Sequence, residues 1–202
     1  EGRMERIGIF GGTFNPVHSG HLLLARHYLD ALKLDRLLVI PTGTPPHKDA
    51  PELLDGEKRM QLCALAFEDQ PQVQLCDIEL RREGKSFTVD TVGWLRQQYP
   101  QAQLYLLVGS DMFLSFERWK SWQQILQQVT LCTAARSTGE LLQLRRHAQQ
   151  LMPYGSTLVF DFPVLEVSST QIRRRLKEGL DCSQLLPEKV YQQILQQNLY
   201  RG

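Results

Sequence analysis

The apolar and polar residues of this chain follow two periods. Residues 37–40 and 104–108 are continuously apolar, which is typical of central strands in a parallel sheet because both of their faces are buried. Between such runs, apolar residues recur at helical spacing. The pattern predicts strands over 6–10, 36–40, 73–80, 103–108, 131–135 and 157–162, and helices over 19–32, 56–69, 88–99, 122–128, 140–151, 169–177 and 187–199.

The predicted strands and helices alternate, which favours an α/β fold: a Rossmann-like parallel sheet with helices on both faces. The last two helices have no strand between them, so about residues 169–202 are expected to form a small C-terminal helical appendage. The length of 202 residues fits a single domain over 4–202. Glu1-Gly2-Arg3 stands before Met4, resembles a remnant of cloning, and is left out of the fold prediction.

One block, Gly-Gly-Thr-Phe-Asn-Pro-Val-His-Ser-Gly-His at 11–21, joins the first strand to the first helix. Glycines at such a turn let the backbone approach a ligand, and a helix N-terminus offers free N–H groups and a positive dipole end to phosphate. His18 and His21 are three positions apart and are expected on one helical face. Taken singly, each feature has another explanation: the glycines could form a plain turn, and the histidines could be core residues or part of a metal site. The block as a whole favours a site for nucleotide phosphates.

Four segments that could bind phosphate each follow a predicted strand: 11–21, 41–48, 109–111 and 168–173. Ligands of open parallel sheets bind outside the carboxyl ends of the strands, so these segments are expected to converge at one edge. In the last of them, Ser168 and Gln171 have the spacing of a capping box, which would simply start a helix. Both interpretations are compatible, because a capped helix N-terminus also binds anions.

The composition of the chain argues against several classes of function. The net charge of +1 argues against a nucleic-acid partner. The four cysteines lack C-x-x-C spacing, and no H-E-x-x-H or cysteine cluster completes a metal site with the two histidines, so no protein-bound metal is expected. Neither a signal peptide nor a membrane-spanning apolar run is found, and a cytoplasmic enzyme without a membrane partner is expected. The sequence leaves open whether the chain forms a homo-oligomer.

Together with three further segments, the block resembles a known family. It matches the G-G-T-F-x-P-x-H-x-G-H signature of the nucleotidyltransferase superfamily. Ser-Phe-Thr-Val-Asp-Thr at 86–91, Gly-Ser-Asp at 109–111 with Trp119 eight positions on, and Val-Ser-Ser-Thr-Gln-Ile-Arg at 167–173 are similar to segments of bacterial nicotinate-nucleotide adenylyltransferases. The resemblance covers about residues 6–200.

This resemblance implies transfer of AMP from MgATP to nicotinate mononucleotide, giving deamido-NAD and pyrophosphate in NAD biosynthesis. The attack would be direct and in line, without a covalent enzyme intermediate, and Mg²⁺ would enter bound to ATP. The alternatives are a transferase for phosphopantetheine or nicotinamide mononucleotide, a tRNA synthetase, or a nucleotide sensor or oxidoreductase. The chain is short for a synthetase, and it has neither G-x-G-x-x-G nor a Walker motif.

The resemblance also implies a set of ATP-binding residues. His18 and His21 would be the catalytic residues, binding the phosphates and stabilising the transition state. A protonated imidazole would donate stronger hydrogen bonds to phosphate. A mobile loop containing Pro-Pro-His-Lys would bring a basic residue to ATP. The expected ATP-binding residues are Gly11, Gly12, Thr13, Phe14, His18, His21, His47, Lys48, Ser169, Thr170 and Arg173.

The mononucleotide is expected to contact Thr88, Asp111, Trp119 and Arg136. The resemblance implies that the region of Trp119 stacks on the pyridine ring and that Arg136 meets the mononucleotide phosphate. Asp111, just past an apolar strand, could hold ribose hydroxyls or lie near adenosine. From the residues alone, Thr88 could be a helix cap, Asp111 a turn residue and Trp119 a core residue. Lys120 departs from the family, in which many members have an aromatic residue there.

Overall fold

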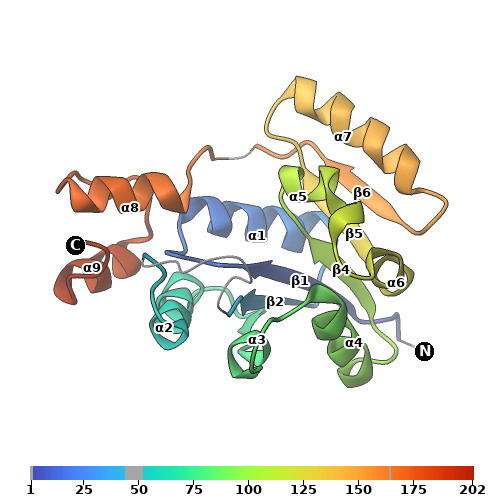
Figure 1. Ribbon diagram of the computed structural model, residues 1–202, viewed down its shortest axis with the longest axis horizontal. Helices are drawn as coiled ribbons and strands as arrows, with labels where there is room; N and C mark the ends of the chain where they lie inside the picture. The colour runs from blue at the N-terminus through green and yellow to red at the C-terminus, as the bar shows by residue number, and fades with distance from the viewer. Residues whose placement is uncertain (1, 44–51, 164) are drawn as a thin grey trace.

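The computed structural model describes residues 2–43, 52–163 and 165–202 (Figure 1). Its centre is a six-stranded sheet in the order β3-β2-β1-β4-β5-β6, with every neighbouring pair parallel. This is the doubly wound Rossmann order, in which the chain reverses its direction of winding between β1 and β4. The strands are β1 (Arg6–Gly12), β2 (Arg36–Pro41), β3 (Val73–Leu75), β4 (Gln103–Leu107), β5 (Thr130–Ala134) and β6 (Thr157–Phe160).

Helices cover both faces of the sheet, as the alternation of elements predicts. One hydrophobic cluster joins Leu37, Val39 and Leu107 of the sheet to α1 (Ser19–Ala31), α2 (Gly56–Ala66), α8 (Ser169–Lys177) and α9 (Glu188–Gln196). The other joins Ile9 and Leu106 to α4 (Thr88–Gln98), α5 (Ser110–Leu114), the 3-10 helix η1 (Phe116–Arg118), α6 (Trp122–Gln128) and α7 (Thr138–Leu151). The central strands are buried on both sides, which explains their continuous apolar runs.

The two C-terminal helices lie at the end of the molecule towards which β1 runs (Figure 1). Ile172 and Leu176 of α8 and Val190 and Ile194 of α9 are fully or almost fully buried in the cluster that also contains α1 and α2. The helical appendage therefore shares its core with the sheet. This packing brings the N-terminus of α8 to the carboxyl edge of the strands, although Ser169 lies 157 positions after Gly12 in the sequence.

The predicted strand over 73–80 is wrong in its second half. The sheet pairing ends at Leu75, and Ile78–Arg81 forms the short helix α3. Apolar residues at 73, 75, 78 and 80 resemble strand alternation, but the carbonyl of Asp77 accepts hydrogen bonds from the backbone N–H groups of Leu80 and Arg81. The sequence prediction also missed α5 and η1, which are short and follow β4 directly.

Candidate active site

The turn after β1 is built so that an imidazole can cap the next helix. His18 is the N-cap of α1, and its Nδ1 accepts a hydrogen bond from the backbone N–H of Gly20 at 3.1 Å. A Cβ on Gly20 would lie 2.9 Å from Cε1 of His18, closer than side chains tolerate. The glycine between the two histidines is therefore required for the His18 ring to fold over the helix end. Phe14, at φ 49°, gives the turn its sharp bend.

The two histidines form a reciprocal cap. Nδ1 of His21 accepts from the backbone N–H of His18 at 3.0 Å, and the two rings are stacked with centroids 3.7 Å apart. A backbone N–H can only donate, so Nδ1 of both rings must be unprotonated. Each neutral ring then carries its proton on Nε2. The sequence placed the pair on one helical face; the structure makes one of them the cap and fixes both as Nε2–H donors.

Both imidazoles are held neutral. Burial lowers the pKa of His18 to about 4. Burial also lowers the pKa of His21 well below its ordinary value, and the neighbouring His18 adds to this. The sequence argument relied on the protonated forms, whereas a proton on Nδ1 would break the cap that each ring makes. In the folded chain the pair therefore supplies two neutral hydrogen-bond donors.

This burial predicts a pH dependence of stability. The unfolded chain protonates His18 near pH 6.5 and the folded chain near pH 4. Between these values the unfolded state binds more protons, so stability is complete above about pH 6.5 and is lost as the pH falls. We expect the free energy of unfolding to fall by about 2 kcal/mol through His18 between pH 7.5 and pH 5.

Denaturant titrations at the two pH values measure this effect. The matched variant is His18→Asn, because asparagine keeps an N-cap acceptor and does not titrate. We expect its stability to change less than that of the unaltered chain over this interval, by the same 2 kcal/mol or so. Equal pH dependence of both proteins would show that His18 is not held neutral.

The N-terminus of α8 meets the turn after β1. The Ser168 hydroxyl accepts from the backbone N–H of Gln171 at 3.0 Å, as the capping-box spacing predicts. The Ser169 hydroxyl donates to the carbonyl of Pro16 at 2.9 Å, and Nη1 of Arg173 donates to the carbonyl of Asn15 at 2.8 Å. Segments 11–21 and 168–173 thus lie against each other, as the rule for strand ends predicts.

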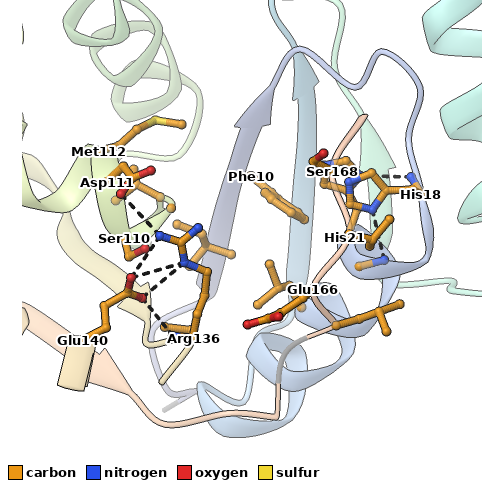
Figure 2. A pocket seen from close by; sticks show the side chains of 18 of the residues that line it. Phe10, His18, His21, Ser110, Asp111, Met112, Arg136, Glu140, Glu166 and Ser168 are labelled. Carbon is orange, nitrogen blue, oxygen red and sulfur yellow. Dashed lines mark hydrogen bonds and ion pairs between the residues drawn. The ribbon is translucent and has the colours of Figure 1, made fainter. Parts of the chain in front are cut away.

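A cavity of about 710 Å³ opens at this edge of the sheet. Figure 2 shows His18, His21 and Ser168 on one side of it and Asp111, Arg136 and Glu140 on the other, with Phe10 between them. The cavity lies over the carboxyl ends of β1 and β4, where the strand order reverses. In an open α/β sheet this is the place at which nucleotides bind.

Arg136 is held in the cavity by two carboxylates. Its Nη2 lies 3.0 Å from Oε2 of Glu140 and 3.4 Å from Oδ1 of Asp111, and its backbone N–H donates to Oε1 of Glu140 at 2.8 Å. These hydrogen bonds raise the pKa of Arg136 and contribute to lowering that of Glu140. Glu140 was missed by the sequence analysis. Ser137, the N-cap of α7, and Glu140 three positions on form an S-x-x-E capping signature that could have found it.

The remaining predicted residues lie elsewhere. Gly11 and Gly12 end β1, and Thr13 and Phe14 begin the turn that follows it. Ser169, Thr170 and Arg173 are the first, second and fifth residues of α8. None of these residues lines the cavity. His47 and Lys48 lie outside the described residues.

Thr88 and Trp119 do not line the cavity either. Thr88 is the first residue of α4, after its N-cap Phe87, and Trp119 packs on Phe116 with ring centroids 5.0 Å apart. Their two segments nevertheless meet, because Nζ of Lys120 lies 4.3 Å from the ring centroid of Phe87. The residue that departs from the family pattern therefore joins the two predicted mononucleotide segments.

Two features are absent from the described part of the chain. Within residues 2–43, 52–163 and 165–202, no three His, Cys, Asp or Glu side chains gather closely enough to hold a metal ion. Across the same ranges, none of the helices has both the length and the apolar character needed to cross a bilayer.

Comparison with known proteins gives concordant results. The Cytidylyltransferase-like family model matches residues 9–175. The "Probable nicotinate-nucleotide adenylyltransferase" of Clostridium tetani is 35% identical over 98% of this chain and 100% of that protein. Its namesake from Neisseria meningitidis serogroup B is 38% identical over 98% of this chain and 99% of that protein.

A solved structure has the same fold. The nicotinic acid mononucleotide adenylyltransferase of Plasmodium falciparum complexed with NaAD superimposes with a TM-score of 0.81, over 97% of both chains and at 16% identity. The same enzyme complexed with APC gives a TM-score of 0.79.

Proposed function

The chain belongs to the Cytidylyltransferase-like family and, within it, to the nicotinate-nucleotide adenylyltransferases; on this basis we propose how it transfers AMP from MgATP to nicotinate mononucleotide in NAD biosynthesis. The products are deamido-NAD and pyrophosphate. One observation carries the proposal: His18 and His21, whose Nδ1 atoms both accept backbone hydrogen bonds, line the same cavity as Ser168, the N-cap of α8. Neutral donors and a positive helix end are suited to a polyphosphate.

Adenylyl transfer requires the protein to position the two substrates rather than to form a covalent bond with either of them. The attacking phosphate of the mononucleotide must stand in line with the α-phosphate of ATP, and such placement supplies roughly 7–11 kcal/mol of the barrier. We assign the charge that develops on the α-phosphate to the Nε2–H groups of His18 and His21. The N–H groups of the turn after β1 and of the α8 N-terminus would hold the triphosphate. Mg²⁺ would arrive on the triphosphate as part of the substrate.

The two ends of the site would take different groups. Asp111 and Arg136 line the same cavity as the histidines. This supports a position near adenosine for Asp111, and Arg136 would then lie near the same nucleotide. Thr88 and Trp119 would receive the pyridine ring of the mononucleotide. The contact of Lys120 with Phe87 supports this, because it holds the segments of Thr88 and Trp119 together. The ammonium of Lys120 would also attract the ring carboxylate of a nicotinate.

This arrangement predicts a preference for the acid over the amide. We expect kcat/KM for nicotinate mononucleotide to exceed that for nicotinamide mononucleotide by about 10-fold or more, because a carboxylate gains charge-assisted hydrogen bonds. The measurement is pyrophosphate release with MgATP and each mononucleotide. A ratio near one would contradict the substrate assignment. No release with either mononucleotide would contradict the transferase itself.

The direct transfer can be tested separately. With ATP carrying a chiral thiophosphate at the α position, one in-line displacement inverts the configuration at phosphorus. A covalent adenylyl-enzyme would need two displacements and would retain it. We expect inversion in the deamido-NAD formed by this chain; retention would contradict the mechanism and leave the substrate assignment intact.

A further inference from the structure

A buried arginine that the mechanism does not use lies behind the phosphate-binding turn. Arg59, on α2, is only 2% exposed. Its Nη1 donates to the carbonyls of Thr13 at 2.9 Å and Thr42 at 2.7 Å, and its Nε donates to the carbonyl of Leu54 at 2.7 Å. A single guanidinium therefore holds three segments of backbone that are distant in the sequence.

All three segments belong to the carboxyl edge of the sheet. Thr13 is in the turn after β1, Thr42 follows β2, and Leu54 precedes the N-cap of α2. The turn and the loop are also joined directly, because the backbone N–H of Thr42 donates to the carbonyl of Gly12 at 2.8 Å. Arg59 thus fixes the turn that carries the histidines relative to Thr42, which directly follows β2.

The charge of Arg59 has no carboxylate to neutralise it among the ion pairs of the described residues. Burial lowers the pKa of Arg59, but a guanidinium stays charged at physiological pH. Taking a charge out of water costs free energy even where, as here, three backbone carbonyls accept its hydrogen bonds. A positive charge behind an anion-binding turn is useful where phosphates bind.

The carbonyls that Arg59 holds also orient the opposite sides of their peptides. In a trans peptide the N–H and C=O groups point in opposite directions. With the carbonyls of Thr13 and Thr42 turned towards the guanidinium, the N–H groups of Phe14 and Gly43 are turned away from it. An N–H group directed in this way can face an anion bound at the edge of the sheet.

We propose that Arg59 is a positioning residue for the triphosphate: it holds the turn after β1 and residues 42–43, which directly follow β2, so that the N–H groups of Phe14 and Gly43 meet the phosphates. The inference rests on the proposed function, since it assumes that ATP is the ligand of this edge. It adds a residue from outside the signature block, acting through backbone carbonyls and through its charge.

Arg96 provides a matched control. On α4, its Nη1 donates to the carbonyls of Tyr99 at 3.3 Å and Ala102 at 2.6 Å, and its Nη2 to that of Gln128 at 2.7 Å. Like Arg59, it fixes loops through three carbonyls. These loops precede β4 and β5, so Arg96 serves the amino edge of the sheet, opposite the cavity. Arg59→Met and Arg96→Met therefore remove similar anchors from opposite ends of the strands.

The experiment compares two ligands by calorimetric titration, in which the stoichiometry counts the folded sites. One ligand is adenosine and the other a non-hydrolysable triphosphate analogue of ATP. We expect Arg59→Met to raise the dissociation constant of the triphosphate analogue, measured per folded site, by about 10-fold. This is the lower end of the effects seen for residues that orient a site. Adenosine is expected to bind Arg59→Met as tightly as it binds the unaltered chain. Arg96→Met is expected to bind both ligands with unaltered affinity. Arg59→Lys keeps the charge without the planar fork, so its affinity for the analogue should lie between those of Arg59→Met and the unaltered chain.

Equal weakening of both ligands by Arg59→Met, or of neither, would overturn the proposal. If Arg59→Met and Arg59→Lys both fail to fold while Arg96→Met folds, Arg59 is a folding residue and the proposal is also overturned. Because binding needs no turnover, the result stands apart from the proposed function. That function fails instead if the unaltered chain forms no deamido-NAD from MgATP and nicotinate mononucleotide.

Discussion

Replacing His21 by alanine is expected to lower kcat by about 10²- to 10³-fold, the range found when one preorganised donor to a transition state is removed. The Nε2–H of His21 is such a donor because its Nδ1 already accepts from the backbone of His18 at 3.0 Å. Its ring is further held against Phe14, with centroids 4.8 Å apart. The ring therefore needs no reorganisation when charge develops on the α-phosphate.

Steady-state kinetics with MgATP and nicotinate mononucleotide measure the loss. A donor that acts only in the transition state should lower kcat and kcat/KM together, whereas lost ground-state binding would raise KM alone. The variant also removes an acceptor for the N-cap, so its stability needs a reference. His27→Ala provides one, because His27 lies on the same helix and stacks on Phe162 at 4.9 Å, outside the cavity. A folded His21→Ala variant with nearly unaltered kcat would remove the pair from the mechanism.

The sheet and the location of the site could be predicted from the sequence for a physical reason. Strands buried on both faces must be continuously apolar, and in a parallel sheet their carboxyl ends share one edge. Residues 37–40 and 104–108 therefore indicated the centre of the sheet, and the segments after β1, β4 and β6 indicated the edge at which the cavity opens. The second half of the strand predicted over 73–80 failed because a four-residue helix and a strand edge have similar apolar spacing over so short a distance.

The states of the site residues depend on contacts that no local pattern contains. The spacing of His18 and His21 indicated a pair but not that each Nδ1 caps a backbone N–H, which sets the tautomer and makes protonation unfavourable. The sequence did not single out Arg59, because the carbonyls of Thr13, Thr42 and Leu54 converge on it only in the folded chain. Such long-range hydrogen bonds become visible only when the fold brings the segments together.

Arg173→Ala is expected to lower kcat/KM for MgATP by about 100-fold, because hydrogen bonds from a charged donor contribute roughly 1.5–3 kcal/mol each. Two donors of Arg173 are already used, Nη1 on the carbonyl of Asn15 at 2.8 Å and Nη2 on the Thr170 hydroxyl at 3.3 Å. Its Nε lies 3.5 Å from a carboxylate oxygen of Glu52. A guanidinium has five N–H donors, so among the described residues some of them have no acceptor and could bind a triphosphate at the N-terminus of α8.

Initial rates over a range of MgATP concentrations test this, and the neighbouring residue separates phosphate binding from helix stability. Arg174 is exposed on the same helix, and Arg174→Ala should leave kcat/KM unchanged. Arg173→Lys keeps the charge but not the planar fork, so it should recover only part of the loss. If instead Arg173→Ala changes kcat with no effect on KM for MgATP, Arg173 acts by anchoring the turn at Asn15. The triphosphate would then be held by His18, His21 and the backbone of the two capped helix ends.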